Sequence, residues 1–119
     1  MEKKLYREEL TQMEINAHRA SLNGEPAVYC GTYGKYNNGD ISGMWVDVAS
    51  FADYEEFMEF CERVHADEED VELMFQDYEG FPYAWYSESG MGEETFDRIK
   101  EFAALDNDKR EAYEAYLDN

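Results

Sequence analysis

The sequence contains few basic residues. Its 10 lysines and arginines stand against 29 aspartates and glutamates, so the formal net charge is −19. Such an excess disfavours binding to nucleic acid or to an anionic membrane, because like charges would have to approach each other. We therefore expect basic protein partners, and neither direct nucleic-acid binding nor membrane binding.

Cysteines and long hydrophobic runs are scarce as well. Two cysteines do not make a disulfide framework, and we expect Cys30 and Cys61 to be reduced thiols buried as small hydrophobic side chains. No apolar run approaches the roughly 20 residues of a transmembrane helix. Residues 1–10 are too charged for a signal peptide. These absences predict a cytoplasmic protein.

High net charge often marks disorder, but the composition argues against disorder here. The chain is 44% hydrophobic and 16% aromatic, which is ample material for a core, whereas disordered acidic chains are poor in aromatics. Its 119 residues suffice for one compact domain or two very small ones. The charge therefore lies on a folded protein.

The negative charge is unevenly distributed along the chain. Residues 1–26 and residues 27–52 each carry a net charge of −1, whereas residues 53–119 carry 22 acidic and five basic groups, for a net of −17. Almost the whole electrostatic field of the protein therefore comes from its second half.

In the first half, the pattern predicts one helix and a β-hairpin. Apolar residues at helical spacing predict an amphipathic helix over residues 3–22, which the segment Asn23-Gly24-Glu25-Pro26 ends. Residues 27–36 and 41–48 are rich in strand-forming side chains, and a tight-turn signal over residues 37–40 separates them.

In the second half, we expect three helices and a third strand. Asp53 and Glu56 are typical of a helix start, and this helix runs to about residue 65. Residues 72–78 suit a strand that pairs with the hairpin. Two short helices follow. The first, about residues 93–105, is expected to bury Phe96, Ile99, Phe102 and Ala103, and the second, about residues 109–117, Ala112, Tyr113, Tyr116 and Leu117.

Nine further aromatic residues are expected to fill a small core. They are Tyr29, Tyr33, Tyr36, Trp45, Phe51, Tyr54, Phe57, Phe75 and Tyr78. A few exposed tyrosines would remain to stack on a partner. His65, near a helix C-terminus, is expected to be a surface residue or a favourable end charge.

Three stretches resemble the ArdA antirestriction proteins carried by conjugative elements. The first covers residues 27–39 and continues through residues 43–47. The second is the acidic helix of residues 53–65. The third covers residues 72–82 and is followed by residues 87–89. The order and spacing of these stretches, over roughly residues 26–89, make the combined pattern specific.

The resemblance implies an α+β fold. A small three-stranded antiparallel sheet with one packed helix, over residues 26–80, would be followed by a small helical domain, residues 81–119. An N-terminal helical extension, residues 1–25, would precede them in an elongated molecule. Family members usually carry a third domain that supplies a dimer contact and a C-terminal antirestriction motif. We expect a short form without it, since no room remains after about residue 105.

The resemblance also implies a function. Members imitate bent B-form DNA and occupy the DNA-binding groove of type I restriction-modification enzymes, which blocks restriction, and commonly modification, of incoming DNA. The partner would be the methyltransferase core of such an enzyme. No cofactor is expected, and the protein would not be an enzyme.

The residues themselves support imitation of DNA. B-DNA presents about one charge per 1.7 Å of axis, whereas one helix row with a carboxylate every three or four residues offers one per roughly 5–6 Å. About three parallel rows would match DNA. The expected phosphate-mimicking carboxylates are Glu55, Glu56, Glu59, Glu62, Asp67, Glu68, Glu69, Asp70, Glu72, Asp77, Glu79, Glu88, Glu93, Glu94, Asp97, Glu101, Glu111, Glu114 and Asp118.

Other chemistry finds little support. Ser87-Glu88-Ser89-Gly90 is not a G-x-S-x-G nucleophile elbow. Asp106-Asn107-Asp108 begins like a calcium loop, but Glu111 stands where glycine is needed and Leu117 where the bidentate glutamate belongs. We therefore expect no catalytic residues and no metal site. An acidic module that binds another basic protein, such as a nucleoid or conjugation protein, remains the alternative.

Overall fold

The computed structural model describes residues 4–118 of the chain. Its helices are α1 (Gln12–His18), α2 (Tyr33–Asn37), α3 (Tyr54–Val64), α4 (Glu93–Ala103) and α5 (Asn107–Asp118). Its strands are β1 (Ala27–Thr32), β2 (Met44–Asp47) and β3 (Leu73–Glu79), and two short 3-10 helices are η1 (Val48–Ser50) and η2 (Tyr83–Trp85). The molecule measures 53 × 30 × 23 Å. The predicted α+β class and elongated shape are confirmed.

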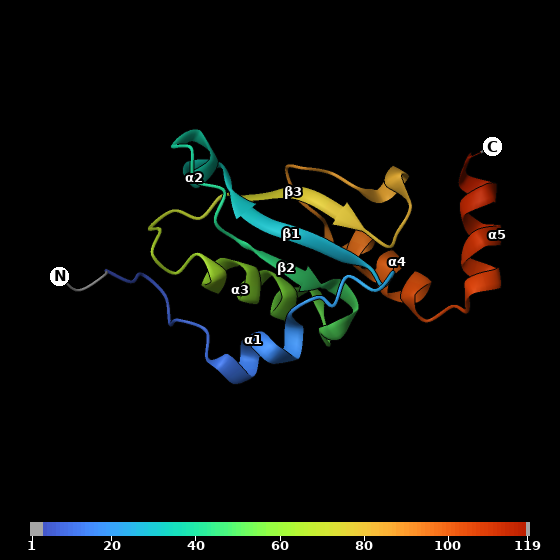
Figure 1. Cartoon of the computed structure of the whole chain (residues 1–119), viewed down its shortest axis with the longest axis horizontal. Helices are drawn as coiled ribbons and strands as arrows, with labels where there is room; N and C mark the ends of the chain where they lie inside the picture. The colour runs from blue at the N-terminus through green and yellow to red at the C-terminus, as the bar shows by residue number, and fades with distance from the viewer. Residues whose placement is uncertain (1–3, 119) are drawn as a thin grey trace.

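The three strands form one antiparallel sheet with β1 in the centre, between β2 and β3 (Figure 1). Both outer edges are partly covered by other segments. Ala20 N donates to Trp45 O on β2 at 3.1 Å, and Phe75 N on β3 donates to Glu88 O at 2.8 Å. These bonds leave less of the sheet edge available for pairing with another chain.

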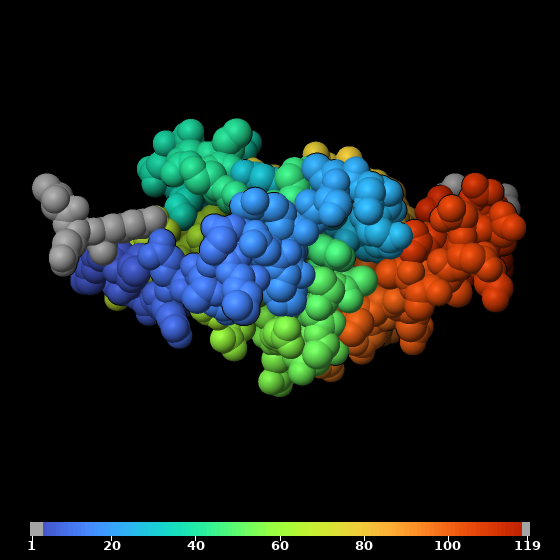
Figure 2. Space-filling view, turned by 60° about the horizontal axis from the view of Figure 1, so that its bottom comes forward, coloured from blue at the N-terminus to red at the C-terminus, as the bar shows by residue number. Residues whose placement is uncertain are grey.

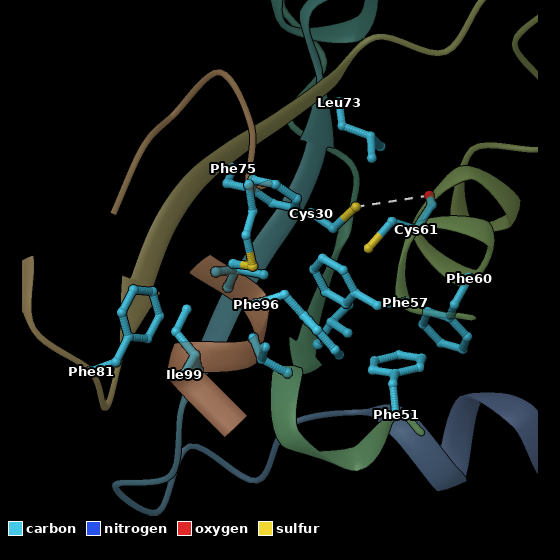
Figure 3. Packing of buried hydrophobic residues seen from close by; sticks show 14 of the residues in the cluster. Cys30, Phe51, Phe57, Phe60, Cys61, Leu73, Phe75, Phe81, Phe96 and Ile99 are labelled. Atoms are coloured by element: carbon cyan, nitrogen blue, oxygen red, sulfur yellow. Dashed lines mark hydrogen bonds between the residues drawn. The ribbon is translucent and has the colours of Figure 1, made fainter. Parts of the chain in front are cut away.

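One core cluster joins the sheet to α3, which lies below the strands in Figure 1, and to α4, which lies at their right-hand end. Phe57 of α3 lies at its centre, with ring centroids 6.0 Å from Phe75 of β3 and 5.4 Å from both Phe96 of α4 and Phe51 (Figure 3). Each of these four rings is at most 1% exposed. Burial of such a side chain contributes about 1.5–3 kcal/mol. The predicted division of the chain into an N-terminal extension, an α+β domain and a helical domain, with boundaries at residues 25–26 and 80–81, stays a prediction.

The predicted N-terminal helix is wrong for most of its length. Only Gln12–His18 is helical, begun by a capping box in which Thr11 and Glu14 each bind the other's backbone. Before it, residues 4–11 form an extended arm along the C-terminal end of α3, where Tyr6 N donates to Ala66 O at 2.8 Å. Contacts with α3 thus satisfy backbone groups that a longer helix would have bonded internally. Residues 1–3 of the predicted extension lie outside the described residues.

The predicted hairpin is right in its pairing and wrong in its turn. Strands β1 and β2 pair antiparallel, with Val28 opposite Val46. Between them, however, the chain forms α2, because the Thr32 hydroxyl accepts from Lys35 N at 3.1 Å and caps a helix. The second strand consequently begins at Met44 rather than at Ile41, whose side chain is exposed.

In the second half, the predictions for α3, β3 and α4 are confirmed. Asp53 caps α3, and Phe96, Ile99 and Phe102 of α4 are buried. Ala103, also expected to be buried, is half-buried at the end of α4. The predicted burial along α5 is wrong: Ala112, Tyr113 and Tyr116 are exposed and Leu117 is half-buried. Helix α5 projects at one end of the molecule, so little chain lies beside it to cover these side chains (Figures 1 and 2).

The expected aromatic core is confirmed for its phenylalanines and only partly for the others. Phe51, Phe57 and Phe75 are buried. Tyr29, Tyr33, Trp45, Tyr54 and Tyr78 are half-buried at the margin of the core, and Tyr36 of α2 is exposed. Cys30 and Cys61 are free and buried, as expected. Within residues 4–118, no helix has the length and apolar character needed to cross a bilayer.

Candidate functional site

Helix α3 presents carboxylates on the side opposite its buried stripe. The side chain of Asp53 accepts a hydrogen bond from Glu56 N at 2.8 Å and fixes the first turn. From there Phe57 and Cys61 point into the core, because residues four apart share a helix face. The other face carries exposed carboxylates, among them Glu55, Glu56 and Glu59, which line a shallow groove of about 430 Å³ with Asp53, Glu14, Arg63, Phe51 and Phe60.

Some of the predicted carboxylates already have a cationic partner inside the molecule. Glu62 pairs with Arg7 at 3.8 Å, Asp67 and Glu68 pair with Lys35 at 2.9 and 3.9 Å, and Glu94 pairs with Arg98 at 2.8 Å. Glu56 lies 3.6 Å from the imidazole of His18. Glu68 is also sheltered, because its Oε2 is buried without a hydrogen-bond partner. Paired or sheltered carboxylates offer less charge to an external partner.

The other predicted carboxylates are exposed, and within residues 4–118 no ion pair engages them. They are Glu55, Glu59, Glu69, Asp70, Glu72, Asp77, Glu79, Glu88, Glu93, Asp97, Glu101, Glu111 and Glu114. We call this set the open carboxylates. The side chain of Asp118 lies outside the described side chains.

The elements that carry the open carboxylates follow one another along the molecule. Helix α3 lies left of the centre in Figure 1, α4 right of it and α5 at the right end. The longest dimension, 53 Å, corresponds to about one and a half turns of B-DNA at roughly 34 Å per turn. A duplex of that length carries about 30 phosphate charges. The net charge of −19 is of the same order.

A family model described as "Antirestriction protein (ArdA)" matches residues 28–119. The chain belongs to the ArdA antirestriction family. ArdA proteins are non-enzymatic inhibitors that imitate DNA and act on type I restriction-modification enzymes, and this chain shares that function. The match extends beyond the resembling stretches, through α4 and α5, and leaves the N-terminal arm and α1 outside. Searches of curated proteins and of solved structures gave no match.

A second group of polar residues in this ArdA protein is buried beneath α2. His65 is 1% exposed, so its expected place on the surface is wrong. Its Nε2 lies 3.0 Å from Cys30 O, and its Nδ1 lies 2.8 Å from Lys35 Nζ. Since the Lys35 ammonium can only donate, Nδ1 accepts and Nε2 carries the proton that bonds the carbonyl. His65 therefore links β1, α2 and the end of α3.

The Cys30 thiol lies beside this histidine and donates to Cys61 O at 3.8 Å (Figure 3). The neighbouring Cys61 thiol, followed by His65, lowers the pKa of Cys30, whereas burial raises the pKa of Cys61. Within residues 4–118, no three His, Cys, Asp or Glu side chains gather as metal ligands would.

Sequence reasoning missed how the N-terminal arm attaches to α3. Arg7 Nη1 donates to Glu68 O at 2.8 Å, and Arg63 Nε donates to Glu8 O at 3.0 Å. Figure 2 shows the arm and α1, in blue, spread over this side of the molecule. The partners lie more than 50 residues apart in the chain, so no local pattern signals them.

Proposed function

We propose that the open carboxylates are the phosphate mimics of this ArdA protein, and that it occupies the DNA-binding groove of the methyltransferase core of a type I enzyme. Occupation of that groove would block modification as well as restriction, since both activities need DNA there. The strongest support is that helices α3, α4 and α5, which all carry open carboxylates, follow one another along the 53 Å axis of the molecule.

Helix α4 supplies a row suited to a test. Glu93, Asp97 and Glu101 are spaced four residues apart on one exposed side of the helix, while Phe96 and Ile99 of the same helix are buried. Since the row does not take part in the core, we expect its neutralisation to leave the fold intact. The paired carboxylate Glu94, bonded to Arg98, stands on the same helix and provides a control.

The experiment measures how well each variant displaces labelled duplex DNA from a purified type I methyltransferase core at several salt concentrations. We expect the triple variant Glu93→Gln, Asp97→Asn, Glu101→Gln to bind at least tenfold more weakly at low salt. Its slope of log K against log salt should become shallower, by up to about 0.9 per charge removed. Each single variant, and Glu94→Gln, should change affinity less than about threefold.

Two results would contradict the proposal. One is a triple variant with wild-type affinity and an unchanged slope. The other is a single substitution that abolishes binding, since that would place the interaction in one localised contact rather than in a distributed field.

A further inference from the structure

Three tyrosines gather where the chain leaves β3. The ring of Tyr78 on β3 stacks on that of Tyr86 at 4.5 Å between centroids, with 21° between the planes. Tyr83, the first residue of η2, lies 6.1 Å from Tyr78 and 6.4 Å from Tyr86. We call these three rings the tyrosine platform. It is formed by the end of β3 and the segment between β3 and α4, drawn in yellow and orange in Figure 1.

Two rings of the platform are half-buried and held in place, and the third is open to solvent. Tyr86 donates its hydroxyl hydrogen to Phe75 O at 2.6 Å, which anchors the ring on β3. Tyr78 also packs on the buried Phe81, at 5.2 Å between centroids. Tyr83, in contrast, is 75% exposed. The exposed ring of Tyr83 therefore packs against two rings whose positions are fixed by the fold.

Two exposed carboxylates, Asp77 and Glu88, lie next to the platform. The Asp77 carboxylate accepts a hydrogen bond from Tyr78 N at 2.8 Å. The backbone carbonyl of Glu88 accepts from Phe75 N at 2.8 Å, on the same residue whose carbonyl the Tyr86 hydroxyl binds. Burial, followed by the charges of Glu88 and Asp77, raises the pKa of Tyr86. Both belong to the open carboxylates, with no ion pair to any described basic residue. A ligand for this surface therefore carries positive charge.

Of the cationic side chains, arginine fits such a surface best. Its guanidinium is planar, stacks on an aromatic face, and presents a fork of N–H donors to a carboxylate at the same time. Lysine offers a point charge without a face to stack. In DNA complexes, arginine side chains pair with phosphates and with the edges of guanine bases. An arginine in a DNA-binding groove is therefore suited to an environment that combines aromatic rings with negative charge.

We propose that the tyrosine platform receives an arginine of the type I enzyme's DNA-binding groove, with the guanidinium stacked on Tyr83 and paired with Asp77 or Glu88. This inference rests on the proposed function. It adds one specific contact, between a guanidinium group and the platform, to the distributed electrostatic attraction of the open carboxylates. The platform would stand in for the base stack, and the neighbouring carboxylates for phosphates.

The chain offers a matched control for Tyr83. Tyr116 on α5 is 78% exposed, and within residues 4–118 no other ring contacts it. Both side chains can be removed without opening the core. The displacement assay would compare Tyr83→Ala, Tyr83→Phe and Tyr116→Ala with the wild type at several salt concentrations, with circular dichroism as a check of the fold.

We expect Tyr83→Ala to bind about 3–30-fold more weakly, with the wild-type salt slope because no charge is lost. Tyr83→Phe should keep near wild-type affinity, since the ring face remains, and Tyr116→Ala should be unchanged. In the double variant Tyr83→Ala, Asp77→Asn, the losses should be less than additive, because both residues would hold one guanidinium.

The inference is overturned if the wild type displaces DNA while Tyr83→Ala and Tyr116→Ala behave alike, or if Tyr83→Phe loses as much affinity as Tyr83→Ala. In those cases the proposed function stands without it. If the wild-type protein displaces no DNA at low salt, the proposed function fails and this inference fails with it.

Discussion

Glu14 and Arg63 form a bidentate ion pair that connects the N-terminal arm and α1 to α3. Glu14 Oε2 accepts from Arg63 Nη1 at 2.6 Å, and Oε1 accepts from Nη2 at 2.9 Å. Arg63 also donates to the backbone carbonyls of Glu8 and Glu9, at 3.0 and 3.3 Å. Because the family match begins at residue 28, this pair attaches a segment outside the match to the part that belongs to ArdA.

The pair should make stability depend on pH. The hydrogen bond from Arg63, followed by that from Thr11, lowers the pKa of Glu14 to about 2. A glutamate in the unfolded chain titrates near 4.3. A carboxyl group whose pKa is lower in the folded state stabilises the fold fully at pH values above its pKa in the unfolded chain. This contribution to the free energy of unfolding is lost as the pH falls through the folded-state pKa of about 2.

We therefore expect Glu14→Gln to be less stable than the wild type at pH 7, with a difference that narrows below about pH 4 and closes near pH 2. Urea unfolding at a series of pH values measures it. Glu94→Gln, which removes an exposed pair within α4, is the control and should show little difference at any pH. A Glu14→Gln deficit that stays constant from pH 7 to pH 2 would contradict the account.

The central position of Phe57 makes a second prediction. Its side chain is fully buried and contacts the rings of Phe51, Phe75 and Phe96. Phe57→Ala should lower the free energy of unfolding by about 3–5 kcal/mol, measured by urea denaturation. Tyr116→Ala, on the exposed side of α5, should change it by less than about 0.5 kcal/mol. Similar losses in both variants would mean that the core is not centred on α3.

A third prediction compares two glycines with similar backbone. Gly80 has φ +80° and Gly39 has φ +77°, a region that favours glycine. A Cβ on Gly80 would overlap the carbonyl group of Glu25, whereas a Cβ on Gly39 would meet nothing within 4 Å.

Gly39→Ala should therefore cost only the strain of the positive φ, about 1–2 kcal/mol, and Gly80→Ala clearly more. Thermal melting of both variants measures the difference. Equal midpoints would show that the chain after β3 does not lie against residues 25–26 as described.

Lys35 supports a fourth prediction. Its ammonium contacts His65 Nδ1 at 2.8 Å, Asp67 at 2.9 Å and the sheltered Glu68 at 3.9 Å. Removal of this one cation leaves a buried acceptor on His65 and a poorly solvated carboxylate. Lys35→Met should lower the free energy of unfolding by about 1–3 kcal/mol, while Lys109→Met, at an exposed position, should be nearly neutral. A neutral Lys35→Met variant would mean that water replaces the ammonium.

Local patterns predicted the elements whose signals lie close together in the sequence. Asp53 caps α3 three residues before the N–H it binds, and the stripe Phe96, Ile99, Phe102 on α4 repeats at helical spacing. The same reasoning predicted exposed carboxylates on both helices. These features follow from a few neighbouring residues, so sequence alone was enough for them.

The errors arose where distant segments compete with local preference. The arm over residues 4–11 bonds to the end of α3 instead of continuing α1, and Lys35 holds His65 and Asp67 some 30 residues away. Tyr116 has helical spacing but no neighbouring element to bury it. For the same reason, the sequence did not reveal which carboxylates an internal cation already engages.

The most direct test of the central claim is whether this ArdA protein and duplex DNA exclude each other on a type I methyltransferase core. The binding constant of the labelled protein for the core would be measured at rising concentrations of unlabelled duplex carrying the recognition site. If the carboxylates imitate phosphates in the DNA groove, the apparent Kd rises in proportion to the duplex concentration without reaching a plateau. A plateau, or a complex that contains protein, core and duplex together, would contradict the account.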